Sequence, residues 1–197
     1  VKPVLEILGP KARGRAVAGV YVMLTKKGPK FFADTAINQD PTAERVAEIA
    51  VQAAELVKRM NIEPSIALLS YSNFGSSDGK TPKKMRDALR ILHENHPDLT
   101  VDGEMQANFA VDKDQLKEQF PFSDLVGSPP NIFIFPGLSS ANIGYKLLQS
   151  MAGMEAVGPL LIGLDYPAHV LQLGADVREI VNTTAMAVVD AQSRETR

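Results

Sequence analysis

The pattern of apolar residues near the start of the chain predicts a β-hairpin. The run RAVAGVYVMLT at 15–25 is rich in β-branched residues, and a second short apolar run follows at 30–34. The residues between them, at 26–29, read KKGP and are typical of a turn. Two such runs around one turn indicate two antiparallel strands.

A long amphipathic helix is predicted next. Asp40 provides an N-cap, and Pro41 suits the first helical position. Apolar residues then recur at steps of three and four from Val46 to Met60, which places them on one face of a helix. We expect this helix to end near Asn61.

Short apolar runs and helical patterns alternate through the rest of the chain. The predicted strands are at 66–70, 99–104, 131–135 and 157–164. The predicted helices begin at Thr81-Pro82, cover 113–120 and 140–151, and close the chain after Asp176. The last helix is indicated by a capping pair, Asp176 and Glu179, and by Ile180, Val181, Thr184 and Val188, which share one face. This alternation implies right-handed crossovers, so we expect an α/β domain with a mostly parallel sheet.

Composition narrows the possible functions. The net charge is −2 with acidic and basic residues mixed, which argues against nucleic acid or an anionic membrane as a partner. The absence of cysteine excludes disulfides and a cysteine nucleophile, and a cytoplasmic location is expected. No apolar run reaches about 18 residues, and the start at Val1 lacks a signal peptide and an initiator methionine. We therefore expect a piece of a longer protein.

Ligands of open α/β sheets bind beyond the carboxyl ends of the parallel strands, which makes the loops there the first candidates for a site. The loop 70–77 can present backbone N–H groups and hydroxyls to a phosphate, although such loops are also common as plain turns. Asp102 and Glu104 can serve acid/base chemistry, hold a metal, or form a turn of salt-bridged acids. A serine cap with Asn142 and Lys146 at a later helix start can face an anion, or can simply fix the loop and lie in solvent.

The remaining motifs are less informative. His93 and His96 close a helix, and His169 is predicted to stand alone in a loop, so no metal-ligand spacing is found. The sequence has no G-x-G-x-x-G after a strand and no Walker loop, so the usual modes of nucleotide binding are not supported.

Five runs, taken together, resemble the phosphate acetyltransferase and butyryltransferase (phosphotransacetylase) family. They are FADTAINQDPTAE at 32–44, LSYSNFGSS at 69–77, DLTVDGEMQ at 98–106, NIFIFPGLSSANIGYK at 131–146 and VGPLLIGL at 157–164. The resemblance covers nearly the whole chain. It is closer still to the transferase-like C-terminal domain of bacterial multidomain NADP-dependent malic enzymes, on the runs SNFGSS at 72–77, KKMRDAL at 83–89 and IVNTTAMAV at 180–188.

The resemblance implies a three-layer αβα fold of the phosphotransacetylase type, similar to that of isocitrate and isopropylmalate dehydrogenases. It implies a mostly parallel sheet with an antiparallel hairpin. It also implies a main α/β lobe over about 12–165, and a returning segment with a helix of the other lobe over about 166–197.

The catalytic positions of the family are replaced in this chain. Family members that transfer acetyl groups between coenzyme A and phosphate share two features. These are a Leu-Ser-Arg-Gly run after the last strand and an Asp near the start of the final helix. This chain has Gln172 and Leu173 in place of the Ser and Arg, and Glu179 in place of the Asp. A cation must hold the phosphoryl oxygens in that reaction, and Leu173 cannot do so. We therefore assign no catalytic residue.

The resemblance implies a non-catalytic role for this chain. We expect it to be a regulatory and oligomerisation domain of an NADP-dependent malic enzyme that senses acetyl-CoA. Upstream domains, with NADP and a divalent metal, are expected to convert malate to pyruvate by oxidative decarboxylation. The expected partners of this chain are a second copy of itself, in a dimer or higher oligomer, those upstream domains and an acyl-CoA. The expected acyl-CoA cleft includes Ser72, Asn73, Gly75, Ser76, Asn142 and Lys146. This chain is expected to bind no cofactor, metal, nucleic acid or membrane itself.

Two alternatives remain open. The first is an active phosphate acetyltransferase that uses other residues. Its candidate groups are Gln172, Glu179, His169, Asp102 and Glu104, and its candidate cations are Arg178 and Lys146. The second is a purely structural dimerisation module with an empty cleft.

Overall fold

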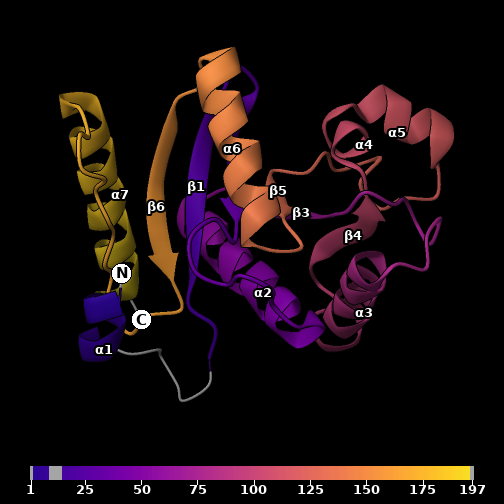
Figure 1. Ribbon diagram of the computed structural model, residues 1–197, viewed down its shortest axis with the longest axis horizontal. Helices are drawn as coiled ribbons and strands as arrows, with labels where there is room; N and C mark the ends of the chain where they lie inside the picture. The colour runs from indigo at the N-terminus through magenta and orange to yellow at the C-terminus, as the bar shows by residue number, and fades with distance from the viewer. Residues whose placement is uncertain (1, 9–14, 196–197) are drawn as a thin grey trace.

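The fold is described from a computed structural model in which residues 2–8 and 15–195 are placed (Figure 1). The strands are β1 (Ala18–Thr25), β2 (Gly28–Ala33), β3 (Ser65–Leu69), β4 (Thr100–Met105), β5 (Ile132–Ile134) and β6 (Ala156–Ile162). The helices are α1 (Lys2–Leu8), α2 (Ala43–Arg59), α3 (Lys80–Asn95), α4 (Ala107–Val111), α5 (Lys113–Gln119), α6 (Leu138–Ala152) and α7 (Val177–Glu195).

The strands form one sheet in the order β4-β3-β5-β2-β1-β6. β1 pairs antiparallel with both of its neighbours, β2 and β6, whereas β5 is parallel to β2 and to β3, and β3 is parallel to β4. Five strands therefore run in one direction and β1 runs against them. The predicted hairpin and the mostly parallel sheet are confirmed.

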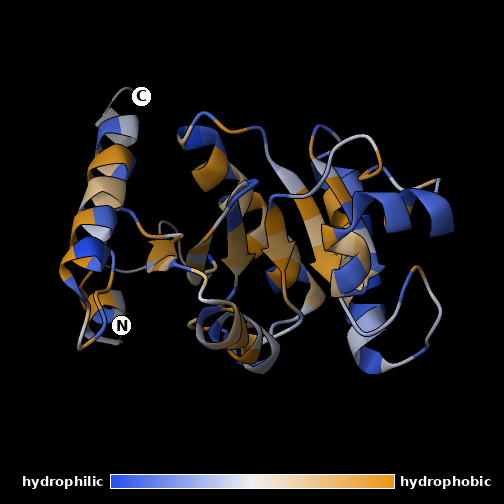
Figure 2. Ribbon diagram, turned by 90° about the horizontal axis from the view of Figure 1, so that it is seen from above, coloured by the Kyte–Doolittle hydropathy of each residue, from blue (hydrophilic) through white to orange (hydrophobic). Residues whose placement is uncertain are grey.

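Helices cover both faces of the sheet, which gives the expected three layers (Figures 1 and 2). One apolar core lies between the sheet and the helices α2 and α3, and it includes Phe31 and Leu92. The other core lies between the opposite face and the helices α4, α5 and α6, and it includes Phe32, Leu116 and Tyr145. Phe31 and Phe32 are neighbours in β2 and enter different cores, because successive side chains of a strand point to opposite faces.

The last helix, α7, lies beside the edge strand β6 (Figure 1). The predicted capping pair at its start is confirmed, since the backbone N–H of Glu179 donates to Oδ1 of Asp176 at 2.8 Å and that of Asp176 donates to Oε2 of Glu179 at 3.1 Å. No helix in the described part of the chain is long and apolar enough to cross a membrane.

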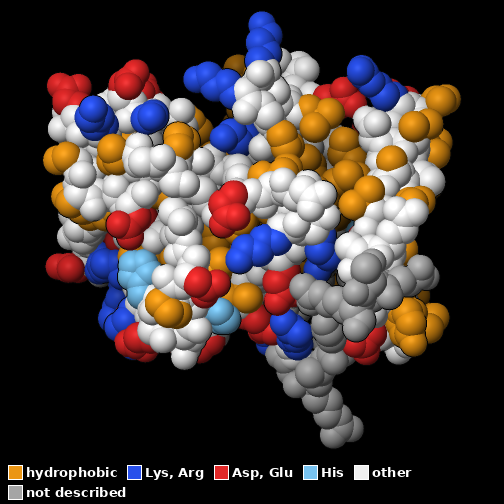
Figure 3. Space-filling model, turned by 180° about the vertical axis from the view of Figure 1, so that it is seen from behind, with side chains coloured by type: hydrophobic (Ala, Val, Ile, Leu, Met, Phe, Trp, Pro, Cys, Tyr) orange, Lys and Arg blue, Asp and Glu red, His pale blue; other side chains and the backbone are white. Residues whose placement is uncertain are grey.

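The apolar face predicted for this helix lies in solvent. Ile180, Val181 and Val188 are exposed, whereas the polar Thr183 and Asp190 are buried. Seen from behind, apolar side chains follow α7 along one edge of the molecule, whereas acidic and basic groups mix over the rest of that surface (Figure 3). The helical period was therefore identified, but its apolar side does not belong to the core of the described chain.

The N-cap of the long helix α2 lies two residues after the predicted cap, Asp40. Its N-cap is Thr42, whose hydroxyl accepts from the backbone N–H of Arg45 at 3.3 Å. Asp40 does not cap the helix, because its carboxylate binds the ammonium group of Lys84 at 2.6 Å. A tertiary ion pair thus replaces the local cap that the sequence predicts.

The helix α6 begins at Leu138 rather than at Ser140. Its N-cap is Gly137, and no side chain caps it. The hydroxyl of Ser140 donates to the carbonyl of Gly137 at 2.7 Å, so the predicted serine cap is wrong. The five-residue helix α4 was not predicted, because it is too short to show a helical period.

Candidate ligand site at the carboxyl edge of the sheet

The strand order places a topological switch point between β3 and β5. From β3 the chain passes through α3 to β4 on one side, and from β5 it passes through α6 to β6 on the other side. The loops that leave adjacent strands in opposite directions leave a crevice between them, where ligands of open α/β sheets bind. The loop 70–79 and the start of α6 flank this point, as the sequence predicts.

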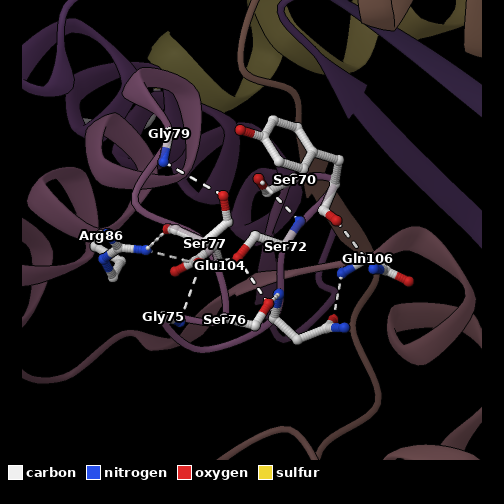
Figure 4. A network of polar contacts seen from close by, with 11 residues as sticks. Ser70, Ser72, Gly75, Ser76, Ser77, Gly79, Arg86, Glu104 and Gln106 are labelled. Atoms are coloured by element: carbon white, nitrogen blue, oxygen red, sulfur yellow. Dashed lines mark hydrogen bonds and ion pairs between the residues drawn. The ribbon is translucent and has the colours of Figure 1, made fainter.

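The loop 70–79 is fixed to the end of β4 (Figure 4). The backbone N–H of Phe74 donates to the carbonyl of Glu104 at 2.7 Å. The backbone N–H of Gln106 donates to the side-chain oxygen of Asn73 at 2.8 Å. The end of β4 therefore holds the loop 70–79, which follows the neighbouring strand β3.

A buried carboxylate lies beneath this loop. Glu104 has no solvent exposure, and its Oε1 accepts from Ser72 Oγ at 2.8 Å, from the backbone N–H of Gly75 at 3.0 Å and from Arg86 Nη1 at 3.0 Å. Within the described residues, no group donates to its buried Oε2. An ionised carboxylate in such a place requires a nearby cation and several donors, and Arg86 supplies the charge.

Four of the six predicted site residues belong to this network. Ser76 Oγ lies 3.0 Å from Ser72 Oγ and accepts from the backbone N–H of Asn73 at 3.0 Å. The N–H groups of Asn73, Phe74 and Gly75 thus already have acceptors inside the protein. A phosphate can reach these amides only if the loop rearranges, so in this conformation the loop offers side chains rather than a nest of free N–H groups.

The other two predicted residues lie on α6. Asn142 is half-buried in the first turns of the helix, and Lys146 is exposed with its Nζ 5.7 Å from the centre of the Tyr145 ring. Because they are four residues apart, they share one face of the helix. Their role in a ligand site stays a prediction.

Lys84 joins three segments at this edge, and sequence reasoning missed it. Its Nζ donates to Asp40 Oδ1 at 2.6 Å and to the carbonyl of Pro136 at 2.7 Å, which links α3 to the loops after β2 and β5. A depression of about 260 Å³ beside this link is lined by Asn38, Gln39, Asp40, Pro41, Thr42 and Arg45. The one sequence signal for Lys84 was its place in the run KKMRDAL at 83–89.

The two acidic residues at the end of β4 have separate partners. Asp102 Oδ2 accepts from Ser123 Oγ at 2.6 Å and from the backbone N–H of Asp124 at 3.2 Å, whereas Glu104 binds the loop 70–79. Both carboxylates are thus bound within the protein. Among the described residues, no group of three or more acidic or histidine side chains is arranged to hold a metal ion.

Gln172 and Glu179, two of the replaced catalytic positions, line the same small cavity beside Tyr21 of β1. The side-chain nitrogen of Gln172 donates to the hydroxyl of Tyr21, and the Tyr21 ring stacks on Tyr145 with centroids 4.2 Å apart. Burial, followed by the neighbouring phenol of Tyr145, raises the pKa of Tyr21 above its ordinary value. The volume of the cavity is about 30 Å³. It has room for about one water molecule.

The third replaced position, Leu173, has a fully exposed side chain. The cation that the alternative enzyme reading places nearby, Arg178, is 76% exposed and pairs with Glu155 at 3.3 Å. In this arrangement no neighbouring residue holds Leu173 or Arg178 in place for binding a phosphate.

The prediction that His169 stands alone is wrong. Its side chain is 3% exposed, its Nδ1 accepts from the backbone N–H of Leu161 at 3.2 Å, and its Nε2 lies 3.7 Å from Asp190 Oδ2. Asp190 Oδ1 lies 3.2 Å from Nε of Arg59 on α2. The buried group connects α7 to the body of the domain, and the sequence could not reveal it because its members lie far apart along the chain.

The strand order and helices define a doubly wound α/β domain, with its topological switch point between β3 and β5. The profile of the family described as phosphate acetyl/butaryl transferase matches residues 1–188. The chain belongs to this family, as its sequence motifs predict.

Comparison with individual proteins agrees. The NADP-dependent malic enzyme of Haemophilus influenzae is 44% identical over 187 residues, which is 95% of this chain and 25% of that protein. The phosphate acetyltransferase of Clostridium acetobutylicum is 36% identical over 199 residues, which is 98% of this chain and 60% of that enzyme. A phosphotransacetylase structure from Streptococcus pyogenes has a TM-score of 0.88 at 37% identity, and the match covers 98% of this chain and 59% of that one.

These relatives confirm the phosphotransacetylase-like fold and the likeness to the transferase-like region of malic enzymes. The chain spans between a quarter and three fifths of the length of these proteins.

Proposed function

We propose that this domain binds acetyl-CoA as a regulatory signal and mediates oligomerisation in an NADP-dependent malic enzyme, and that it does not itself transfer acetyl groups. The observation that carries the proposal is the state of the three replaced positions. Gln172 is engaged with Tyr21, Leu173 points into solvent, and Glu179 caps α7. None of them supplies the cation and hydroxyl that phosphate chemistry requires.

The similarity to malic enzymes supports the regulatory half of the proposal. Regulation requires only that acetyl-CoA bind one arrangement of the assembly more tightly than another, and a coupling of about 1–3 kcal/mol is sufficient. The acyl-CoA is expected to bind at the switch point, between the loop 70–79 and the start of α6.

The test is calorimetric titration of the chain, and of the longer protein that contains it, with acetyl-CoA. Free phosphate and adenosine are the controls for binding of an anion or of adenine alone. Saturable binding that is weakened by Asn142→Ala and by Lys146→Ala, but not by substitution of the exposed Lys26 in the hairpin turn, is the expected result. Binding that neither α6 variant alters, or no binding to the longer protein, contradicts the proposed site.

The non-catalytic half has its own test. We expect no formation of acetyl-CoA from acetyl phosphate and coenzyme A with the purified longer protein. A rate well above that of the uncatalysed mixture, lost in the variant Glu179→Ala, favours the alternative of an active phosphate acetyltransferase.

A further inference from the structure

A large groove lies on the face of the sheet covered by α4, α5 and α6, at the edge opposite to the switch point. Its volume is about 840 Å³, and its lining includes residues of α4, α5 and α6. Pro129 and Pro130, which precede β5, and Thr25 at the end of β1 also line it. The candidate acyl-CoA site lies where the parallel strands end, so this groove is a separate feature.

The floor of the groove is apolar and buried, and its lining also includes four exposed charged residues, Lys27, Asp112, Lys113 and Asp114. Met23, Phe32 and Phe133 come from three neighbouring strands and point to the same face, while Leu116 and Leu148 come from the helices on either side. A cavity of this volume with an apolar floor falls in the range of small-molecule sites.

Of the five charged residues in this lining, only one is half-buried, and it is a lysine. Lys30 is half-buried, its Nζ donates to the carbonyl of Pro130 at 2.7 Å, and it lies 5.9 Å from the centre of the Phe133 ring. Within the described residues, no carboxylate lies within ion-pair distance of this ammonium group, and the bond to Pro130 uses one of its three donors. Burial, and then the charge of Lys27, lower the pKa of Lys30 below its ordinary value. The groove therefore holds a desolvated positive charge that lacks an anion.

The geometry points to a binding site for an apolar monocarboxylate, such as a straight-chain fatty acid of medium length. The carboxylate pairs with Lys30, and the hydrocarbon chain lies against the partly exposed Phe109, Leu148 and Met154. The half-buried ammonium group of Lys30 beside an apolar floor matches one negative charge with a long apolar body. The exposed Lys27 and Lys113 of the lining are balanced in charge by Asp112 and Asp114, so a multiply charged ligand leaves most of its charge without a partner.

The experiment uses decanoate below its micelle concentration as the probe, with binding followed by calorimetry. We expect saturable binding of one decanoate per chain. Lys30→Met is expected to weaken it about ten-fold or more, since a hydrogen bond to a charged group contributes that much. Lys30→Arg keeps the charge and retains binding. Lys26→Met, on the same hairpin but outside the groove, is the matched control and leaves the affinity unchanged.

Decylamine provides the control of opposite charge, because it carries the same chain and a cation. Equal affinity for decylamine and decanoate, or equal affinity of the Lys30→Met variant and the unaltered chain, overturns the proposal. So does the absence of decanoate binding, and sedimentation then tells whether a second copy of the chain fills the groove. Circular dichroism checks that each variant is folded, and acetyl-CoA binding by Lys30→Met keeps this result distinct from the proposed regulatory function.

Discussion

Arg86 of α3 donates a hydrogen bond from Nη1 to Oε1 of Glu104 at 3.0 Å, at the end of β4. The side chain of Arg86 is 31% exposed and that of Glu104 is fully buried. Arg86 Nη1 also donates to the carbonyl of Ser77 at 3.0 Å. One guanidinium group therefore neutralises the buried carboxylate and holds the loop 70–79 against it.

Replacement of this cation is expected to destabilise the domain. Arg86→Met leaves the Glu104 carboxylate buried without a charged partner, and we expect the free energy of unfolding in urea to fall by about 3 kcal/mol. The double variant with Glu104→Gln is expected to recover much of this loss, because the amide needs no counter-charge. Arg90→Met is the control, since Arg90 pairs with Glu94 in solvent and should cost less than about 1 kcal/mol. An equal loss in both single variants contradicts the argument.

The buried Asp190 is expected to hold α7 in place. Asp190→Ala removes the carboxylate that faces Arg59 and His169, and breaking a buried pair costs about 3 kcal/mol. Limited proteolysis should cut near α7 faster in this variant than in the unaltered chain. Asp98→Ala serves as the control, because Asp98 is 74% exposed and lies 4.0 Å from Lys58. Unchanged proteolysis of Asp190→Ala overturns the prediction.

The backbone architecture could be predicted from the sequence because its signals are local. The turn at Lys26-Lys27, the capping pair at the start of α7 and the alternation of apolar runs with helical patterns each arise from residues within a few positions. Local signals of this kind also fixed the mostly parallel sheet, since short crossovers permit few topologies.

What could not be predicted depends on residues far apart in the chain. Asp40 is of a residue type that often caps a helix, but its carboxylate binds the ammonium group of Lys84, 44 positions later in the chain. His169 reads as a loop residue, and only the folded chain brings Asp190 beside it. The position of the candidate loops at the carboxyl ends of the parallel strands could be predicted, because each loop directly follows its strand in the sequence. The internal bonding of these loops could not be predicted, because the donors to Glu104 come from the loop 70–79 and from α3, which are distant from it in the chain.

Replacement of the exposed Leu173 by arginine is expected to leave the stability of the domain nearly unchanged. Leu173→Arg should change the free energy of unfolding by no more than about 0.5 kcal/mol, because the side chain touches little of the protein. Gln172→Leu, one position away, is the contrast and should cost about 1 kcal/mol, since Tyr21 loses a hydrogen bond. We expect no acetyl transfer by Leu173→Arg, because a cation must also be oriented to act. Activity in this variant would mean that the site is otherwise complete.

Because of the ion pair between Asp40 and Lys84, we expect the stability of the domain to depend on pH in the acid range. The hydrogen bond and charge of Lys84 hold the pKa of Asp40 below its ordinary value of 3.8. A carboxyl whose pKa is lower in the folded state contributes stability that is present above its unfolded pKa and is lost as the pH falls through its folded pKa. Asp40→Asn should therefore be less stable than the unaltered chain at neutral pH, and the difference should vanish in acid below 3.8. Urea unfolding at a series of pH values measures it. In Lys84→Met the carboxyl resonance of Asp40 should titrate near its ordinary value, and a pKa that stays low there assigns the shift to another group.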